Sequence, residues 1–258
     1  MFYKFKEIYQ YRQMLRSLIL TDLRTRYKGS FLGFLWTFIN PLLTLIVYTV
    51  IFSTIMRVNI AHYSMFMFVG LLPWIYFSTG LQNSAGSIIR QSNLVKKIYF
   101  PRIILPLATV GAALINYLLS LLIMIPALYT SGIFLKWIVI YFLLILLVET
   151  ILTVSLSILI SALNVYFRDL EHILGILLMV WFYFTPIIYV DKMIPEKYKM
   201  WFALNPLKPI IESYQNIFLY GVPPQLSSLT KIGLLSVIIL IISILIFEKL
   251  QKWFAEEI

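Results

Sequence analysis

The feature that most constrains this chain is a series of apolar runs, each about as long as a helix that crosses a lipid bilayer. The runs cover approximately 35–56, 63–83, 103–128, 137–163, 173–190 and 229–247. A spanning helix needs about 20 consecutive apolar residues. The 258 residues are 61% hydrophobic and only 12% charged, whereas soluble domains are about 45–50% apolar and about 25% charged. The sequence therefore predicts an all-α integral membrane protein with six transmembrane helices.

The distribution of cations predicts the orientation of these helices. An even number of spans places both termini on one side of the membrane. The short connection between the second and third spans carries Arg90, Lys96, Lys97 and Arg102 and no acidic residue, and such loops remain cytoplasmic. Both termini are therefore expected in the cytoplasm. The net charge of +10 is explained by anionic headgroups, so no nucleic acid is expected as a partner.

The first 28 residues are expected to lie outside the spans, and residues 29–258 to form one six-span domain. Residues 5–20 alternate apolar and polar positions with helical spacing, which is typical of a helix in the membrane interface. This helix is either a simple surface anchor or also a contact for a cytoplasmic partner. A basic collar of Arg24, Arg26 and Lys28 follows. These cations contact lipid phosphates or the substrate at the pore entrance, and the first alternative is favoured. Asn40 and Pro41 predict a kink or break low in the first span.

Two connections are more apolar than simple loops. Residues 90–107 interleave cations with apolar and aromatic side chains, a pattern that predicts a short amphipathic helix ending before Pro101. Its apolar face is expected to dock a partner, the alternative being packing against the bundle or headgroups. Residues 191–228 are too long for a plain connection and contain apolar pieces too short to span. Short helices that dip into the outer interface or cover a pore fit this segment.

Residues with catalytic or metal-binding chemistry are scarce. The sequence has no cysteine and no G-x-x-x-x-G-K-[ST] motif for a nucleotide. His62 and His172 are predicted on opposite sides of the membrane, so no shared metal site is expected. Glu149 lies well inside a predicted span, where an acid has either a structural or a transport-pathway role. The aromatic run Trp181, Phe182, Tyr183 and Phe184 falls near the middle of the fifth predicted span. Its rings could line a path for sugar rings, or face lipid and neighbouring helices.

Three stretches carry a family resemblance: "DLRTRYKGSFLGFLWTFINPLLTLIVYTVIFS", "NLVKKIYFPRIILPL" and "ALNPLKPIIESYQNIFLYG". Together with the amphipathic N-terminus and six-span topology, they resemble the membrane subunits of polysaccharide ABC exporters, the O-antigen and teichoic-acid export permease family. The resemblance covers nearly the whole chain, which would be a single exporter transmembrane domain, residues 1–258.

This resemblance implies a function and a set of site residues. The chain would form a homodimer in the bacterial inner membrane and export a lipid-linked polysaccharide, while two separate ATP-binding-cassette subunits bind ATP and Mg²⁺. The chain itself would then be neither an enzyme nor the holder of a cofactor. The helix from about Phe5 to Leu20 would be the interface helix beside the coupling segment, and short gate helices would occupy residues 198–220 on the extracytoplasmic side. The residues expected to couple to the ATPase are Asn93, Leu94, Val95, Lys96, Lys97, Ile98, Tyr99, Phe100 and Pro101, and those of the gate are Trp201, Phe202, Asn205, Pro206, Tyr214 and Phe218.

Two other functions stay open at this stage. A stand-alone, proton-coupled carrier would depend on Glu149 and need no ATPase. A membrane lipid-sugar transferase would need facing acids or a metal at one interface, and no such group converges in the sequence.

Overall fold

The computed structural model describes residues 7–25, 29–51 and 62–258, and this part of the chain contains helices and connections without a β-strand. A helical turn over residues 7–10 precedes the first labelled helix. The labelled α-helices are α2 (Arg12–Thr25), α3 (Trp36–Tyr48), α4 (Tyr63–Ala85), α5 (Ser87–Arg90), α6 (Ser92–Lys97), α7 (Ile104–Thr130), α8 (Phe142–Tyr166), α9 (Leu170–Tyr183), α10 (Glu196–Ala203), α11 (Leu207–Gln215), α12 (Leu226–Leu250) and α13 (Phe254–Glu257).

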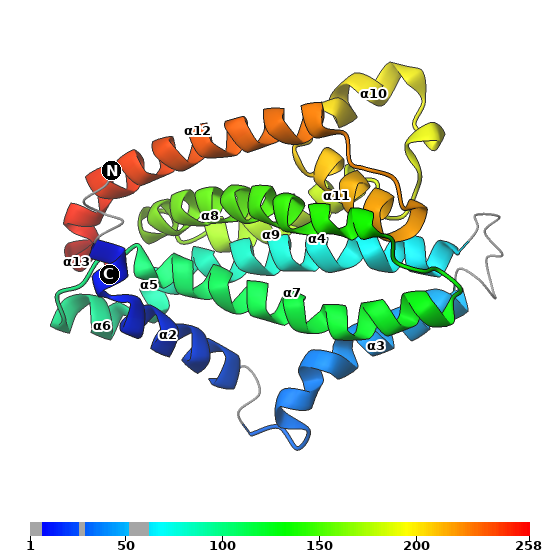
Figure 1. The fold of residues 1–258 in the computed structure, drawn as a ribbon. Helices are drawn as coiled ribbons and strands as arrows, with labels where there is room; N and C mark the ends of the chain where they lie inside the picture. The colour runs from blue at the N-terminus through cyan, green and yellow to red at the C-terminus, as the bar shows by residue number, and fades with distance from the viewer. Residues whose placement is uncertain (1–6, 26–28, 52–61) are drawn as a thin grey trace.

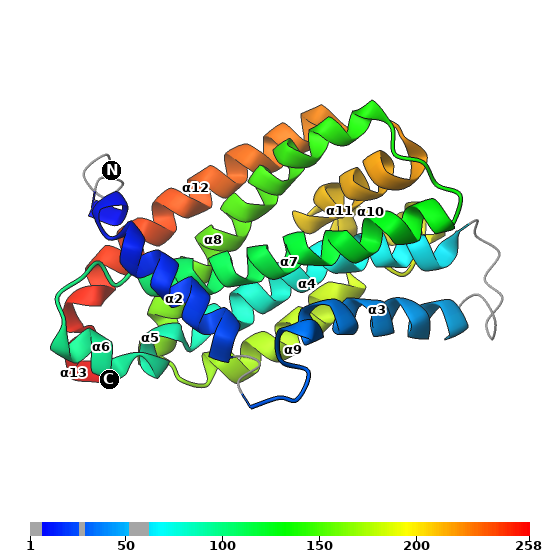
Figure 2. The same ribbon diagram turned by 60° about the horizontal axis from the view of Figure 1, so that its bottom comes forward.

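Long helices that run side by side form the body of the molecule (Figure 1). In the part of the chain that the structure describes, five helical stretches are long and apolar enough to cross a membrane: Gly33–Ile51, Tyr63–Ala85, Ile104–Thr130, Trp137–Tyr166 and Leu226–Trp253. The all-helical membrane fold predicted from the apolar runs is confirmed. Figure 2 shows α3 on the outside of the bundle, next to α4 and α7.

The predicted span at 173–190 differs in the structure. Its helix, α9, has 14 residues and ends at Tyr183, so at 1.5 Å per residue it is only about 21 Å long. Non-helical backbone continues from Thr185. Pro186 supplies the local reason, because a proline disfavours helical backbone in the residue before it. The fifth predicted span is therefore a short helix followed by a bent segment.

Both views place α2, α6 and α13 at one end of the bundle, which we call the terminal end (Figures 1 and 2). The opposite end, where α10 lies, is called the distal end. A shared apolar cluster joins Ile8 and Tyr11 to Phe100, Phe247 and Phe254 at the terminal end. The connection between the second and third spans therefore lies at the same end as α2 and α13 (Figure 1), as its predicted side of the membrane requires.

The predicted interface helix is present and reaches Thr25, five residues beyond Leu20; its first two residues lie outside the described part of the chain. It packs on α7 at Gly111, where an added Cβ would lie only 2.8 Å from Ile19 Cδ1. The side-chain-free surface of this glycine thus allows the close contact between the two helices.

The turn into the first span uses Gly29 and Gly33, whose φ angles are +83° and +48°. These left-handed conformations are readily adopted by glycine. Pro41 does not break the first span, since α3 continues through it from Trp36 to Tyr48, and the alternative of a kink there stays a prediction. The helix tolerates the lost backbone hydrogen bond, as helices in membrane bundles often do.

Candidate translocation and coupling sites

The segment predicted to couple to an ATPase lies at the terminal end and has an inner and an outer side. Val95 and Phe100 are each 5% exposed and belong to the apolar cluster of that end. Ile98 and Tyr99 point outward and are 54% and 88% exposed. Asn93, Lys96 and Lys97 are also exposed, Leu94 and Pro101 are half-buried, and α6 ends at Lys97. The segment therefore offers cations and two large apolar side chains on a firmly anchored base.

A cavity of about 290 Å³ lies beside this segment. Its walls come from three parts of the chain, represented by Glu7, Tyr99 and Lys252. The guanidinium of Arg102 donates to the carbonyl of Gln251, which fixes the segment to the end of α12. The cavity thus combines apolar and charged walls at the end where a partner could reach them.

Polar contacts connect this region to the beginning of α9. Arg90 Nη1 lies 3.2 Å from Glu171 Oε1, and both side chains are partly exposed. The Gln82 amide donates to the backbone carbonyl of Glu171 at 2.9 Å, and the Glu171 amide donates to Asn164 Oδ1 at 3.1 Å. The first turn of α9 is therefore held by α4, α5 and α8. Arg90 and Glu171 are 81 positions apart in the sequence, so only the tertiary structure shows that they are partners.

The aromatic run at the end of α9 divides into different environments. Phe182 and Tyr183 line a hollow of about 410 Å³ between α4 and α9, together with Ser78, Thr79 and Gln82. This hollow has the ring faces and hydroxyl groups that sugar recognition uses.

The neighbouring two rings face other parts of the molecule. Trp181 packs edge-on against Phe77 with a ring-centroid distance of 5.2 Å. Phe184 stacks on Phe202 of α10, with centroids 5.2 Å apart. The run thus contributes both to the hollow and to contacts with the segment predicted to be a gate.

Asn205 fastens the end of α9 to the turn between α10 and α11. Its Oδ1 accepts from Trp181 Nε1 at 2.8 Å and from the Leu207 amide at 2.9 Å. Its Nδ2 donates to the Phe184 carbonyl and to Thr185 Oγ1, both at 2.9 Å. One buried side chain therefore satisfies groups on both sides of the break, which irregular backbone inside a membrane protein requires.

The remaining predicted gate residues follow the same segment inward. Trp201 is 65% exposed, and Pro206 is half-buried in the turn before α11. Tyr214 and Phe218 are buried and stack with centroids 6.4 Å apart. A second polar tie, from Gln215 Nε2 to the Pro186 carbonyl at 3.2 Å, was not indicated by the sequence.

Glu149 lies in α8 and is fully buried. Tyr214 donates its hydroxyl proton to Glu149 Oε2 at 2.7 Å, and Tyr117 and Phe142 pack beside Tyr214. Phe182 and Tyr183 line the hollow between α4 and α9, whose lining does not include Glu149. The carboxyl therefore joins α8 to α11.

Charged residues cluster where α11 begins. Lys208 pairs with Asp191, and its Nζ lies 3.8 Å from Glu212 Oε1. Burial raises the pKa of Glu212 to about 7, although Lys208 acts in the opposite direction. At the other end of the chain, Arg24 is exposed, while Arg26 and Lys28 of the basic collar lie outside the described residues. Within residues 7–25, 29–51 and 62–258, no three His, Asp or Glu side chains are placed to hold a metal ion.

The fold and these sites define a multi-pass membrane protein with an ordered cluster of helices between its last two crossings. The sequence profile of the ABC-2 type transporter family matches residues 13–219. The chain belongs to this family.

Similar proteins extend the match over almost the whole chain. An O-antigen export system permease of Myxococcus xanthus is 41% identical over 255 residues, which are 98% of each chain. An O-antigen export system permease of Klebsiella pneumoniae is 37% identical over 91% of each chain. A polysialic acid transport protein of Escherichia coli is 26% identical over 92% of this chain and 93% of its own length.

Proposed function

We propose that this chain is the membrane subunit of an ATP-driven exporter that moves a lipid-linked polysaccharide across the bacterial cytoplasmic membrane. The observation that carries the proposal is its similarity, over 98% of both chains, to an O-antigen export permease. The aromatic and hydroxyl-lined hollow between α4 and α9 supports a path for sugar rings. In this proposal the terminal end is cytoplasmic, and ATP and Mg²⁺ bind to two separate subunits.

The coupling segment is the proposed docking site for the ATPase. Ile98 and Tyr99 are exposed at the terminal end although both are apolar, while Val95 and Phe100 anchor the same segment in the bundle. Fully covering a large apolar side chain contributes about 1.5–3 kcal/mol, which is an upper bound for Ile98 because it is only 54% exposed. A partner that covers both residues would thus be held firmly, and its movement would reach the bundle through the buried anchors.

We propose that α9 carries this movement to the distal end. Its first turn is held by the Arg90–Glu171 pair, and its last turn is held by Asn205. A displacement of α5 and α6 would therefore pull a short helix that is fastened at both ends, and shift α10 and α11, the proposed gate helices.

A second copy of the chain is proposed to complete the path. Only Thr37, Pro41 and Leu45 of α3 are buried, and Leu43 and Val47 are 47% and 49% exposed. Because the chain contains no cysteine, single cysteines at these two positions give a clean test. Cross-linking of two copies in membranes through these cysteines supports α3 as the contact between them. A cysteine at Leu234 on α12, which is 68% exposed, is the control, and equal cross-linking there opposes the proposal.

The central experiment is reconstitution with the ATP-binding-cassette subunit, followed by measurement of ATP-dependent polymer translocation. The double variant Ile98→Ser, Tyr99→Ser is expected to weaken binding of the ATPase at least about tenfold and to abolish export. Phe167→Ser is the matched control, because Phe167 is 68% exposed and lies between α8 and α9. Export without the ATPase subunit, or normal export by the double variant, would contradict the proposal.

A further inference from the structure

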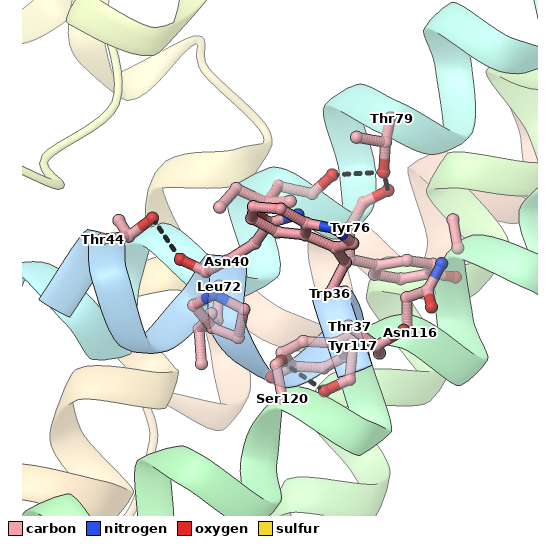
Figure 3. Close-up of a pocket in the computed structure, with 13 residues that line it drawn as sticks. Trp36, Thr37, Asn40, Thr44, Leu72, Tyr76, Thr79, Asn116, Tyr117 and Ser120 are labelled. Atoms are coloured by element: carbon pink, nitrogen blue, oxygen red, sulfur yellow. Dashed lines mark hydrogen bonds between the residues drawn. The ribbon is translucent and has the colours of Figure 1, made fainter. Parts of the chain in front are cut away.

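A cavity of about 320 Å³ lies between α3, α4 and α7 (Figure 3). It is separate from the hollow between α4 and α9, although Thr79 lines both. Trp36, Tyr76 and Tyr117 contribute aromatic walls, and Thr37 and Asn116 contribute polar groups. Asn116 lies near the middle of α7, so the cavity reaches the apolar depth of the membrane.

Two polar side chains of this cavity lack a hydrogen-bond partner among the described residues. Thr37 is 5% exposed, and its hydroxyl is unpaired. Both the nitrogen and the oxygen of the Asn116 side chain are buried and unpaired as well. Pro41, which also lines the cavity, has no N–H to donate to the carbonyl of Thr37. Unsatisfied polar groups are costly at membrane depth, so their presence points to a ligand that pairs with them.

The other hydroxyl groups of the same cavity show the contrast. Thr44 donates to the Asn40 carbonyl at 2.8 Å, Thr79 to the Ile75 carbonyl at 2.6 Å, and Ser120 to the Tyr117 carbonyl at 2.6 Å. These bonds stay within one helix and occupy the hydroxyl proton, as is usual for Ser and Thr in apolar surroundings. Among the described residues, Thr37 and Asn116 are therefore the two buried side chains of this cavity that are free to hydrogen-bond a ligand.

The lining specifies the chemistry of the ligand. None of the lining residues in the described part of the chain is charged, which disfavours a phosphate or an ion at this depth. The Asn116 amide can both donate and accept, and the Thr37 hydroxyl can do the same. Tyr76 and Tyr117 stack with centroids 5.6 Å apart, and Trp36 lines the same cavity. Neutral polar groups beside flat rings suit a ring-shaped ligand that carries several hydroxyl groups.

We propose that this cavity binds a single uncharged sugar ring within the membrane. This inference deepens the proposed export function and rests on it, because that function brings glycans to this protein. Asn116 and Thr37 would pair with the ring hydroxyls, while Trp36 packs on a face of the ring and the two tyrosines form the adjoining wall. The sugar arrives either at the end of a lipid tail or as part of a polymer without one.

The test is equilibrium binding to the purified full-length chain in lipid nanodiscs, without ATP. The probe is radiolabelled octyl glucoside below its micelle concentration. Sugar-free octyl tetraethylene glycol competes for any site that recognises only the tail, and unlabelled maltotriose competes as a sugar without a tail. We expect saturable glucoside binding that the sugar-free detergent does not displace. Displacement by maltotriose would assign the site to polymer, and its failure would assign it to a lipid-linked sugar.

Two variants connect this binding to the cavity. Thr37→Val and Asn116→Leu are each expected to weaken glucoside binding about threefold to tenfold, since each removes hydrogen bonds to the ring. Thr49→Val is the control, because its hydroxyl already donates to the Leu45 carbonyl at 2.8 Å and it does not line this cavity. Melting temperatures identify any variant that misfolds. If Asn116→Leu misfolds, the binding measured for Thr37→Val decides the test, because this substitution keeps the side-chain shape.

Equal binding by Thr37→Val and the unaltered chain, or full displacement by the sugar-free detergent, would overturn the proposal. Because the assay needs neither the ATPase nor translocation, such a result leaves the export function standing. Conversely, loss of export with intact glucoside binding would affect only the proposed function.

Discussion

Asn205 offers the sharpest test of how the short helix α9 is stabilised. It is 7% exposed and makes four hydrogen bonds, to Trp181, Phe184, Thr185 and Leu207. Each such bond contributes about 0.5–1.5 kcal/mol net, so Asn205→Leu is expected to destabilise the chain by about 2–6 kcal/mol. For a chain of this size, 1 kcal/mol corresponds to about 2–4 °C in Tm. The expected loss is therefore roughly 4–24 °C.

The assay is thermal unfolding of the detergent-purified chain, followed by tryptophan fluorescence at one fixed scan rate. Thr185→Val keeps the side-chain shape and removes one of the bonds to Asn205, so its expected loss is a fraction of that of Asn205→Leu. Asn93→Leu is the matched control, because Asn93 is exposed in α6. Equal melting temperatures for Asn205→Leu and Asn93→Leu would refute the assignment of Asn205 as the tie between α9 and α11.

Three further predictions concern other contacts. Glu149→Gln keeps an oxygen that can accept the hydrogen bond from Tyr214, so ATP-dependent export should stay within about twofold of that of the unaltered chain. Loss of export in a transport assay of this variant would favour proton coupling. Gly111→Val should force the close-packed Ile19 away, destabilise the chain by about 1–3 kcal/mol and raise hydrogen exchange in α2. Gly233→Val is the control and should leave the exchange in α2 unchanged, because its added Cβ would make an ordinary 3.6 Å contact. The folded-state pKa of Glu212 is about 7, against 4.5 for an unperturbed carboxyl, so folding favours its protonated form. Its contribution is fully present below about pH 4.5 and is lost as the pH rises through 7; Glu212→Gln should reduce this loss in melting curves from pH 4 to 8, and an unchanged profile would contradict it.

The regular parts of the fold were readable from hydropathy and helical periodicity. The run predicted at 63–83 is α4, Tyr63–Ala85, because a continuous apolar segment in lipid must satisfy its backbone within one helix. The amphipathic face before residue 20 likewise predicted the interface helix. Its extension to Thr25 was missed, since apolar periodicity fades as the cations begin.

The contacts that build the sites could not be read in the same way. Glu149 and Tyr214 are 65 residues apart in sequence and meet only because α11 packs against α8. Arg90 and Glu171 are separated by 81 residues. The sequence singled out Glu149 as an acid inside a span, but nothing local in the sequence named its partner, so both pairings depend on tertiary packing.

The fifth span was predicted to be longer than α9 is, and this error shows how tertiary contacts depend on where a helix ends. A helix that continued through residue 190 would satisfy the Phe184 and Pro186 carbonyls with its own N–H groups. Because α9 stops at Tyr183, the Phe184 carbonyl accepts from Asn205 and the Pro186 carbonyl from Gln215. These side chains belong to the α10–α11 region, so the break in the span is what bonds that region to α9. A fifth helix that continued to residue 190 would leave Asn205 and Gln215 without these carbonyl partners, whereas the shortened helix is bonded to the distal segment through them.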